Sequence, residues 1–221
     1  MKVKPFIFSL YGWTYWLPPL LAGLVAAVTF AAIGNWWLVG LAAVITLAIL
    51  AFFRDPPRAI PQDPGLMVSP ADGKLTHIEV VPNYAPFNGP ALRVSIFLSV
   101  LDVHVNRMPC AGAVLWSRYE EGLFLDARHA DCAIKNQSNL ICLADDAGQP
   151  VVTVKQIVGA IARRIIAPVE NGQKFERGER YGMIAFGSRT EIYVPHPEKW
   201  QPQKQIGDHV AGGRDILLKR K

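Results

Sequence analysis

The sequence predicts an α+β protein, predominantly antiparallel β, that is preceded by a hydrophobic helical hairpin. Two observations support this prediction. Residues 17–53 contain no charged side chain, and most of the hydrophobic excess of the chain lies before Phe53. After Arg54, short runs rich in Val and Ile alternate with turn dipeptides such as Asn-Gly, Asp-Gly and Pro-Gly, which is typical of antiparallel sheets.

Two uncharged stretches, Leu17–Ile33 and Trp36–Phe53, form the predicted hairpin. Each approaches the ~20 residues that cross a bilayer core. Gly34 and Asn35 between them form a turn dipeptide, and the two tryptophans that follow it prefer the headgroup region. We therefore expect residues 1–53 to be a membrane-associated helical hairpin.

Positive charges flank the hairpin, with Lys2 and Lys4 before it and Arg54 and Arg58 after it. Because positively charged flanks stay on the cytoplasmic side, both ends of the hairpin and all that follows are expected there, at the cell membrane. A re-entrant hairpin that enters the bilayer without crossing it fits the same short segments and stays an alternative. A cleaved signal peptide is disfavoured, because a second apolar stretch follows the first at once.

The rest of the chain divides into a linker and a β-rich domain. Residues 54–65 (RDPPRAIPQDPG) hold four prolines and a glycine, which is typical of an extended linker. Residues 66–221 form the predicted domain, with one helix around Val158–Ile165. Its seven predicted strands are Leu75–Val81, Ala91–Ser99, Ala113–Arg118, Leu140–Leu143, Val151–Val158, Tyr181–Phe186 and Glu191–Val194.

Composition limits the classes of function. A net charge of +5 beside an apolar N-terminus favours attraction to an anionic membrane surface over nucleic-acid binding. Cys110, Cys132 and Cys142 form no CxxC pair, which indicates reduced thiols. HxH, HExxH and Cys/His metal spacings are absent from the sequence, so we predict no metal site.

Two segments, Val169–Glu179 and Ile206–Gly213, follow a similar glycine pattern. In each, an apolar residue precedes a polar residue and a glycine, and a second glycine follows a few residues later. This glycine pattern resembles that of lipoyl and biotinyl carrier domains, which are flattened barrels. Those domains need a modifiable lysine at a hairpin tip in a Met-Lys-like context, which is absent here. The resemblance therefore implies a barrel-sandwich element in shape, without carrier chemistry.

Gly187-Ser188, between two predicted strands, is the first candidate for chemistry. The pair is common in sequences, and a simple hairpin turn is its ordinary interpretation. Glycine permits unusual backbone angles and a close approach, so the Ser188 hydroxyl could attack the carbonyl of Gly187. β-Elimination of the resulting ester leaves dehydroalanine, which hydrolyses to a pyruvoyl group. Such a group accepts electrons from a Schiff-base substrate that loses CO2.

Two further polar motifs precede this pair. Ser69–Lys74 contains an Asp-Gly pair that ordinarily marks a tight turn, but a buried Asp72 could instead orient a histidine. Phe97–Pro109 contains His104 and Asn106, which would share one face of an extended segment. A lone histidine is more often structural. We nevertheless favour His104 over the other four histidines because of the polar residues around it in this motif.

Together the motifs resemble the phosphatidylserine decarboxylase proenzymes, in their short, compact bacterial and archaeal branch. The residues that carry the resemblance, in the order and separation of the family, are SPADGK (Ser69–Lys74), FLSVLDVHVNRMP (Phe97–Pro109) and RGERYGMIAFGSRTEIYVP (Arg177–Pro195). The resemblance extends from about Arg54 to the C-terminus, and an N-terminal hydrophobic hairpin is also usual in that branch.

The resemblance implies autocatalytic cleavage between Gly187 and Ser188 into a β chain (1–187) and an α chain (188–221), held together as a heterodimer. Ser188 would become a covalent pyruvoyl cofactor, with no metal or PLP. The implied reaction converts phosphatidylserine in the bilayer to phosphatidylethanolamine and CO2 through a Schiff base. Asp72 is implied to help His104 activate Ser188, and His104 would then protonate the carbanion left by CO2.

Arg107 departs from the longer branch of the family, which has a second histidine at this position. Arginine is a poor base because its pKa lies above ~12. It would instead bind a carboxylate or phosphate of the substrate, with Asn106 as a second candidate contact. Either His104 serves both cleavage and decarboxylation, which we favour, or Asp72 or water takes one of the steps.

Two other functions fit parts of the sequence. A membrane-anchored β domain with a lipoyl-like core could be a non-enzymatic adaptor. A membrane serine hydrolase could use Ser188 with His104 and keep its chain whole. The sequence leaves the acyl-chain preference and the oligomeric state open, a homo-oligomer included.

Overall fold

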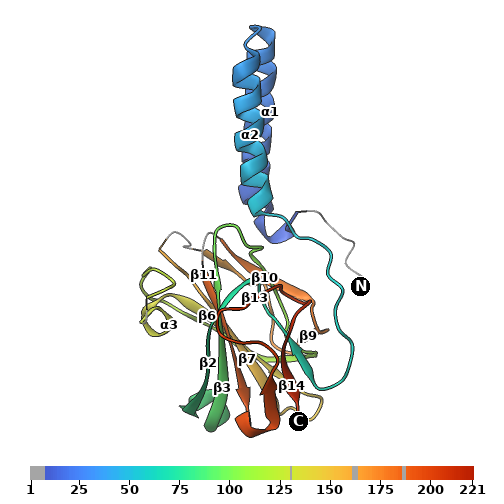
Figure 1. The fold of residues 1–221 in the computed structure, drawn as a ribbon, viewed down its shortest axis with the longest axis vertical. Coiled ribbons are helices and arrows are strands. Elements are labelled where there is room, and N and C mark those ends of the chain that lie inside the picture. The colour runs from blue at the N-terminus through green and yellow to red at the C-terminus, as the bar shows by residue number, and fades with distance from the viewer. Residues whose placement is uncertain (1–7, 130, 161–163, 186–187) are drawn as a thin grey trace. The chain divides into compact units, whose positions relative to one another are not determined.

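The computed structural model describes residues 8–129, 131–160, 164–185 and 188–221 of the 221-residue chain. Its contacts divide the chain into two compact units, Met1–Pro57 and Arg58–Lys221. The first unit contains a pair of apolar helices, and the second contains a curled, mostly antiparallel sheet with short helical turns (Figure 1). The predicted α+β class with a preceding helix pair is confirmed.

A helical hairpin makes up most of the first unit. Its elements are η1 (Leu10–Gly12), α1 (Trp13–Ala32) and α2 (Trp36–Phe52). The predicted turn is confirmed, because Gly34 has a φ of +73° that favours glycine. The Asn35 side chain accepts a hydrogen bond of 3.3 Å from the backbone of α2 and so caps that helix.

The surface of this hairpin is apolar. No residue of α1 is buried, and Val28 and Trp37 are largely exposed. The hydroxyls of Thr29 and Thr46 donate to carbonyls one turn earlier in their own helices, so water is not needed to satisfy them. η1 and α1 together are long and apolar enough to cross a membrane, whereas α2 is a shorter apolar helix.

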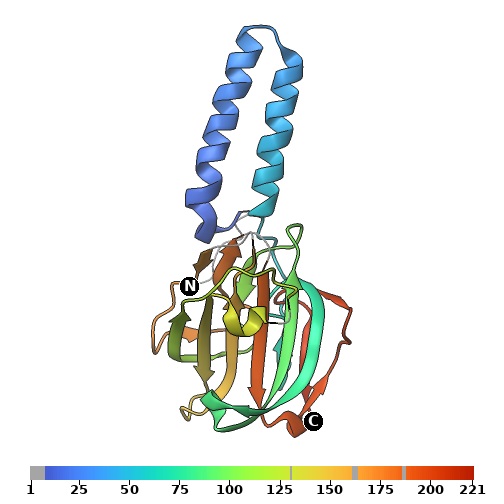
Figure 2. The same ribbon diagram turned by 90° about the vertical axis from the view of Figure 1, so that its left-hand side faces the viewer.

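An eight-stranded antiparallel sheet forms the body of the second unit, in the order β13-β2-β3-β11-β7-β6-β5-β9 (Figure 2). Its strands are β2 (Gly73–Tyr84), β3 (Gly89–Leu98), β5 (Gly112–Glu120), β6 (Ser138–Ala144), β7 (Pro150–Ile157), β9 (Lys174–Phe175), β11 (Ser188–Pro195) and β13 (His209–Val210). β11 lies inside the sheet, with β3 hydrogen-bonded on one side and β7 on the other.

Two three-stranded sheets complete this unit, in the orders β1-β14-β12 and β4-β10-β8. Their strands are β1 (Leu66–Val68), β4 (Val105–Arg107), β8 (Arg164–Ile166), β10 (Arg180–Ala185), β12 (Trp200–Pro202) and β14 (Ile216–Arg220). The short helical turns of the unit are η2 (Ala85–Phe87), α3 (Cys132–Lys135) and η3 (Pro197–Lys199).

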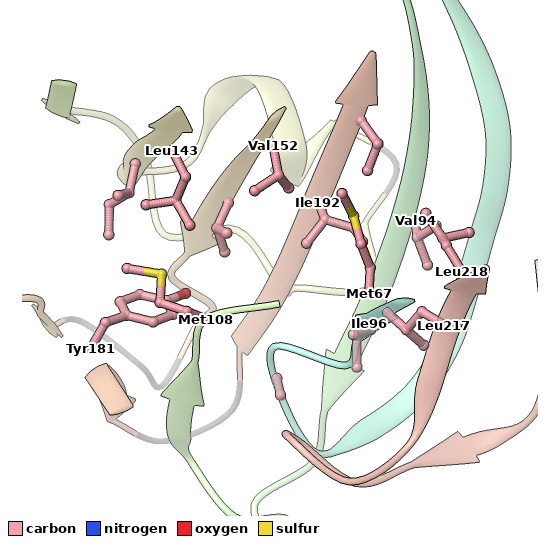
Figure 3. Packing of buried hydrophobic residues seen from close by; sticks show 14 of the residues in the cluster. Met67, Val94, Ile96, Met108, Leu143, Val152, Tyr181, Ile192, Leu217 and Leu218 are labelled. Carbon is pink, nitrogen blue, oxygen red and sulfur yellow. The ribbon is translucent and has the colours of Figure 1, made fainter. Parts of the chain in front are cut away.

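The hydrophobic core lines one face of the large sheet. Ile96 of β3 and Ile192 of β11 share a buried cluster with Met67 of β1 and Leu218 of β14 (Figure 3). Because side chains alternate across a strand, Ile192 places the even-numbered residues of β11 on the core face. Ser188 therefore begins the strand on the same face as the core.

The structure confirms the seven predicted strands over their described residues and corrects the predicted helix. Phe186, at the end of the sixth predicted strand, lies outside the described chain. The helix around Val158–Ile165 is wrong: the described residues of this range are not helical, and Arg164–Ile166 is strand β8, paired with β10. Residues 161–163 lie outside the described chain. The two segments with a similar glycine pattern, Val169–Glu179 and Ile206–Gly213, contain β9 and β13, the two edge strands of the large sheet.

Candidate functional site

The three sequence motifs meet at one end of the large sheet. Ser188 of the third motif pairs with Leu98 of the second, where β3 ends. β4 of the second motif pairs with β10 of the third. The N–H of Arg107 donates to the carbonyl of Pro70, in the first motif, at 2.9 Å. Segments far apart in the sequence are thereby joined around Ser188.

Ser188 is completely buried, and its Oγ has no hydrogen-bond partner among the described residues. Thr190 lies on the same face of β11, two residues on. Its Oγ1 accepts a hydrogen bond of 3.2 Å from Asn106 of β4. The Ser188 side chain therefore lies on the face of the sheet that Asn106, of the Phe97–Pro109 motif, contacts. Gly187, the other predicted cleavage-site residue, lies outside the described residues.

His104 is buried just before β4, and Nδ1 of its ring lies 2.8 Å from the carbonyl oxygen of Asp102. A carbonyl oxygen only accepts, so Nδ1 carries the proton in this contact. In the neutral ring the lone pair is then on Nε2, as a general base requires. The backbone of Asp102 thus selects the tautomer of His104.

The side chain of Asp102 fixes the loop that carries His104. Its Oδ2 accepts hydrogen bonds of 2.7 Å from both the N–H and the hydroxyl of Ser99. Its Oδ1 lies 2.9 Å from Nε2 of His209, on the edge strand β13. Sequence reasoning missed both residues. Asp102 stands two positions before His104, which was a usable signal. His209 lies far along the chain from both residues, and nothing in its local sequence links it to this loop.

Asp72 makes an ion pair that the sequence did not predict. Its Oδ2 lies 2.7 Å from a guanidinium nitrogen of Arg58, and its Oδ1 accepts a hydrogen bond of 2.7 Å from Gly212 N. Burial raises the pKa of Asp72 above its usual value, while the charge of Arg58 and the two hydrogen bonds oppose the rise. Both carboxylate oxygens are therefore engaged, and a direct pair between Asp72 and His104 stays a prediction.

Glycine is required beside Asp72 on steric grounds. Gly73 has a φ of +144°, and a Cβ atom on it would lie 2.2 Å from the carbonyl oxygen of Phe97. Only glycine allows β2 to begin so close to β3. The Asp-Gly pair is therefore more than a surface turn: it places Asp72 against the end of the sheet where Ser188 lies.

Asn106 and Arg107 are buried and bonded within the protein. The Asn106 amide bridges Thr190 and Gln156, the latter at 2.8 Å. The Arg107 guanidinium donates to the carbonyl of Gly178 at 3.1 Å. Both residues belong to the Phe97–Pro109 motif, and their contact with a substrate stays a prediction.

Replacing Arg58 with glutamine is expected to raise the pKa of Asp72 further, because the charge that opposes the effect of burial is lost. At neutral pH the free energy of unfolding should fall by about 2 kcal/mol, less than for a fully buried pair, since a largely buried ion pair loses one partner. A raised pKa in the folded state favours the protonated form, so the loss should shrink as the pH falls toward that pKa. Carboxyl carbon chemical shifts and denaturant unfolding, both followed against pH, measure the two effects.

Arg128→Gln is the matched control for this prediction. Arg128 pairs with Asp126 at 2.6 Å on the surface, where ion pairs contribute little to stability. The control should therefore unfold like the unsubstituted protein. An unchanged pKa of Asp72 in Arg58→Gln would contradict the assignment of Arg58 as its partner.

An apolar N-terminal helix pair is followed by a curled antiparallel sheet that holds a buried serine and a buried histidine at one end. The chain is therefore an α+β protein with buried polar side chains at one end of its sheet. A sequence model of the family described as "Phosphatidylserine decarboxylase" matches residues 45–218. The chain belongs to the phosphatidylserine decarboxylase family. This confirms the resemblance and the enzyme class that its motifs indicate.

Bacterial relatives agree with this assignment over nearly the whole chain. The phosphatidylserine decarboxylase proenzyme of Cupriavidus pinatubonensis is 38% identical over 202 residues, 90% of this chain and 91% of the relative. That of Nitratidesulfovibrio vulgaris is 40% identical over 205 residues, 92% of each chain. That of Trichlorobacter lovleyi is 42% identical over 176 residues, 80% of this chain and 78% of the relative.

Proposed function

We propose that the chain cleaves itself between Gly187 and Ser188 and then converts phosphatidylserine to phosphatidylethanolamine and CO2. The buried Ser188 hydroxyl, without a hydrogen-bond partner among the described residues, is the observation that carries the proposal. An unsatisfied buried hydroxyl costs free energy and calls for a functional explanation. The word proenzyme in the names of the relatives supports a processing step.

In the proposed cleavage, Ser188 Oγ bonds to the carbonyl carbon of Gly187 while its proton passes to a base. The peptide C–N bond then breaks and leaves an ester. Loss of the Ser188 α-proton expels the Gly187 carboxylate and leaves dehydroalanine. Water replaces its nitrogen, which departs as ammonia. The products are residues 1–187 and residues 188–221, the latter beginning with a pyruvoyl group.

The pyruvoyl group supplies an electron sink for the loss of CO2. We assign to His104 the proton transfers around it: removal of the Ser188 proton during cleavage, and return of a proton to the substrate carbon afterwards. The hydrogen bond from Nδ1 to Asp102 supports this role, because it leaves Nε2 able to accept a proton. Asp72, beside the same motif, would stabilise the cationic ring. Arg107 and Asn106 are the proposed substrate contacts.

We also propose that the helical hairpin anchors residues 66–221, the catalytic domain, to the membrane through the linker over residues 54–65. The exposed apolar surface of α1 and the internally bonded threonines support burial in lipid. Lysines and arginines at both ends support a cytoplasmic location for those ends. A net charge of +5 would attract an anionic lipid substrate.

Denaturing mass spectrometry of protein purified from its membrane tests the proposal. We expect a large fragment and a small one over residues 188–221 with a blocked N-terminus that borohydride reduces. An intact 24.4 kDa chain in an active preparation would exclude self-processing. Labelling of a whole chain by a fluorophosphonate would instead indicate a serine hydrolase.

A further inference from the structure

Four large apolar side chains are exposed on two loops of the second unit. Val100 and Leu101, on the loop between β3 and β4, are 48% and 82% exposed. Leu123 and Phe124, on the connection between β5 and β6, are 53% and 40% exposed. We call these four residues the apolar rim. Exposed apolar side chains that gather at one end of a domain are typical of a binding surface.

The strand register places both loops at the end of the sheet where Ser188 lies. β3 ends at Leu98, which is opposite Ser188. The other loop follows from a chain of cross-strand pairs, Arg189 with Ile157, Ile157 with Ser138, and Ser138 with Glu120 at the end of β5. Figure 1 shows the loop after β3, in green, extending beyond the strand ends of this unit. The apolar rim and the candidate site therefore share one end of the domain.

The Val100–Leu101 loop is fixed at its base. The Asp102 carboxylate binds Ser99 on one side of the tip and His209 on the other, and His104 follows two residues later. These bonds hold the two apolar side chains outward on a short, well-anchored tip. A contact made by the tip is thus close along the chain to the proposed proton-transfer residue.

We propose that the apolar rim inserts into the interface of a phospholipid bilayer and holds the site end of the sheet against the lipid headgroups. This inference rests on the proposed function, since a bilayer-resident substrate must reach a site that is buried at Ser188. A lipid surface is favoured over a protein partner because the same chain carries an apolar helical hairpin and a positive net charge. The rim would lower the cost of drawing a headgroup out of the bilayer plane.

Fluorescence depth measurement on the full chain tests the contact. Leu101→Cys and Val80→Cys, each labelled with an environment-sensitive maleimide, are compared on phosphatidylserine/phosphatidylcholine vesicles with brominated acyl chains. Val80 is the matched control, an aliphatic residue 55% exposed near the opposite end of β2. Native thiols should react little, because Cys132 and Cys142 are buried, and Cys110 is partly buried with the pKa of its thiol raised by desolvation.

Quenching by bromolipids at position 101 and not at position 80 is the expected result. Equal quenching at both positions, or none at position 101, would overturn the inference. Protection of position 101 that depends on protein concentration and not on lipid would also overturn it, since the rim would then be a contact between copies of this chain.

Kinetics separate this inference from the proposed function. In Leu101→Ser we expect kcat/KM on vesicle phosphatidylserine to fall about tenfold, the size of effect that follows from removing one aliphatic contact with lipid. Turnover of monomeric dihexanoyl phosphatidylserine should stay within about twofold, and Val80→Ser should match the unsubstituted protein on both substrates. No decarboxylation of either substrate by the unsubstituted protein would refute the proposed function. Normal vesicle turnover by Leu101→Ser would refute only the role of the rim.

Discussion

Replacement of Ser188 by alanine is expected to leave the chain whole at 24.4 kDa and without decarboxylase activity. Alanine has no oxygen to attack the Gly187 carbonyl, so neither the ester nor the pyruvoyl group can form. Intact mass under denaturing conditions and release of CO2 from carboxyl-labelled phosphatidylserine measure the two losses. Activity should fall to the background of the assay, because the whole cofactor is lost rather than one contact to it.

The same variant should be more stable than the uncleaved natural chain. In the unsubstituted chain the Oγ of Ser188 is buried without a partner among the described residues. Removing this atom should therefore raise the free energy of unfolding by about 1–2 kcal/mol. Ser95→Ala is a matched control, in which the free energy of unfolding should change in the opposite direction. Ser95 is equally buried, but its hydroxyl donates to Glu191 at 2.8 Å, so its loss should destabilise the protein and leave cleavage intact. Normal decarboxylation by Ser188→Ala would refute the proposed function.

Replacement of His104 by alanine should reduce decarboxylation by about 10²–10⁴-fold, the range that general acid–base catalysis contributes. The effect on cleavage decides the open question raised by Arg107. Cleavage that slows by a similar factor assigns both proton transfers to His104, whereas normal cleavage assigns the first to Asp72 or water. The fraction of cut chain against time, measured by mass spectrometry after synthesis of fresh protein, gives this rate.

His196→Asn is a suitable control for the loss of a histidine. His196 is exposed, and its φ of +57° is one that asparagine also tolerates. The control should cut and decarboxylate normally. Full decarboxylase activity in cleaved His104→Ala would contradict any catalytic role for His104 in the mature enzyme.

Strands were more predictable from the sequence than the elements that surround them. Alternation and β-branched residues identify the long strands of the large sheet, because their pattern is local. Strands of two or three residues, such as β4 and β9, are too short to show an alternating pattern in the sequence. They form because a neighbouring strand is available to pair with them. At Arg164–Ile166 pairing with β10 outweighs the local spacing that suggested a helix.

The residues that we propose as reactive could be named from the sequence, whereas most of the side chains that support them could not. Three motifs with recognisable chemistry contained Asp72, His104 and Ser188. Some of the supporting side chains come from elsewhere in the chain. Arg58, the partner of Asp72, lies in the proline-rich segment before the sheet, and His209, which contacts the Asp102 carboxylate, lies on a two-residue edge strand. Such pairs depend on which strand ends the fold brings together, and a single sequence does not contain that information.

The inside position of β11 has a consequence for the proposed mature enzyme. Chain termini ordinarily fray, because nothing holds their first residues. The new terminus at position 188 would instead be a residue already paired with Leu98, on a strand bonded along both of its edges. The electrophilic end would therefore be as rigid as the interior of the sheet. The smaller fragment could leave only if its ladders broke together, those of β11 with β3 and β7, of β13 with β2 and of β14 with β1.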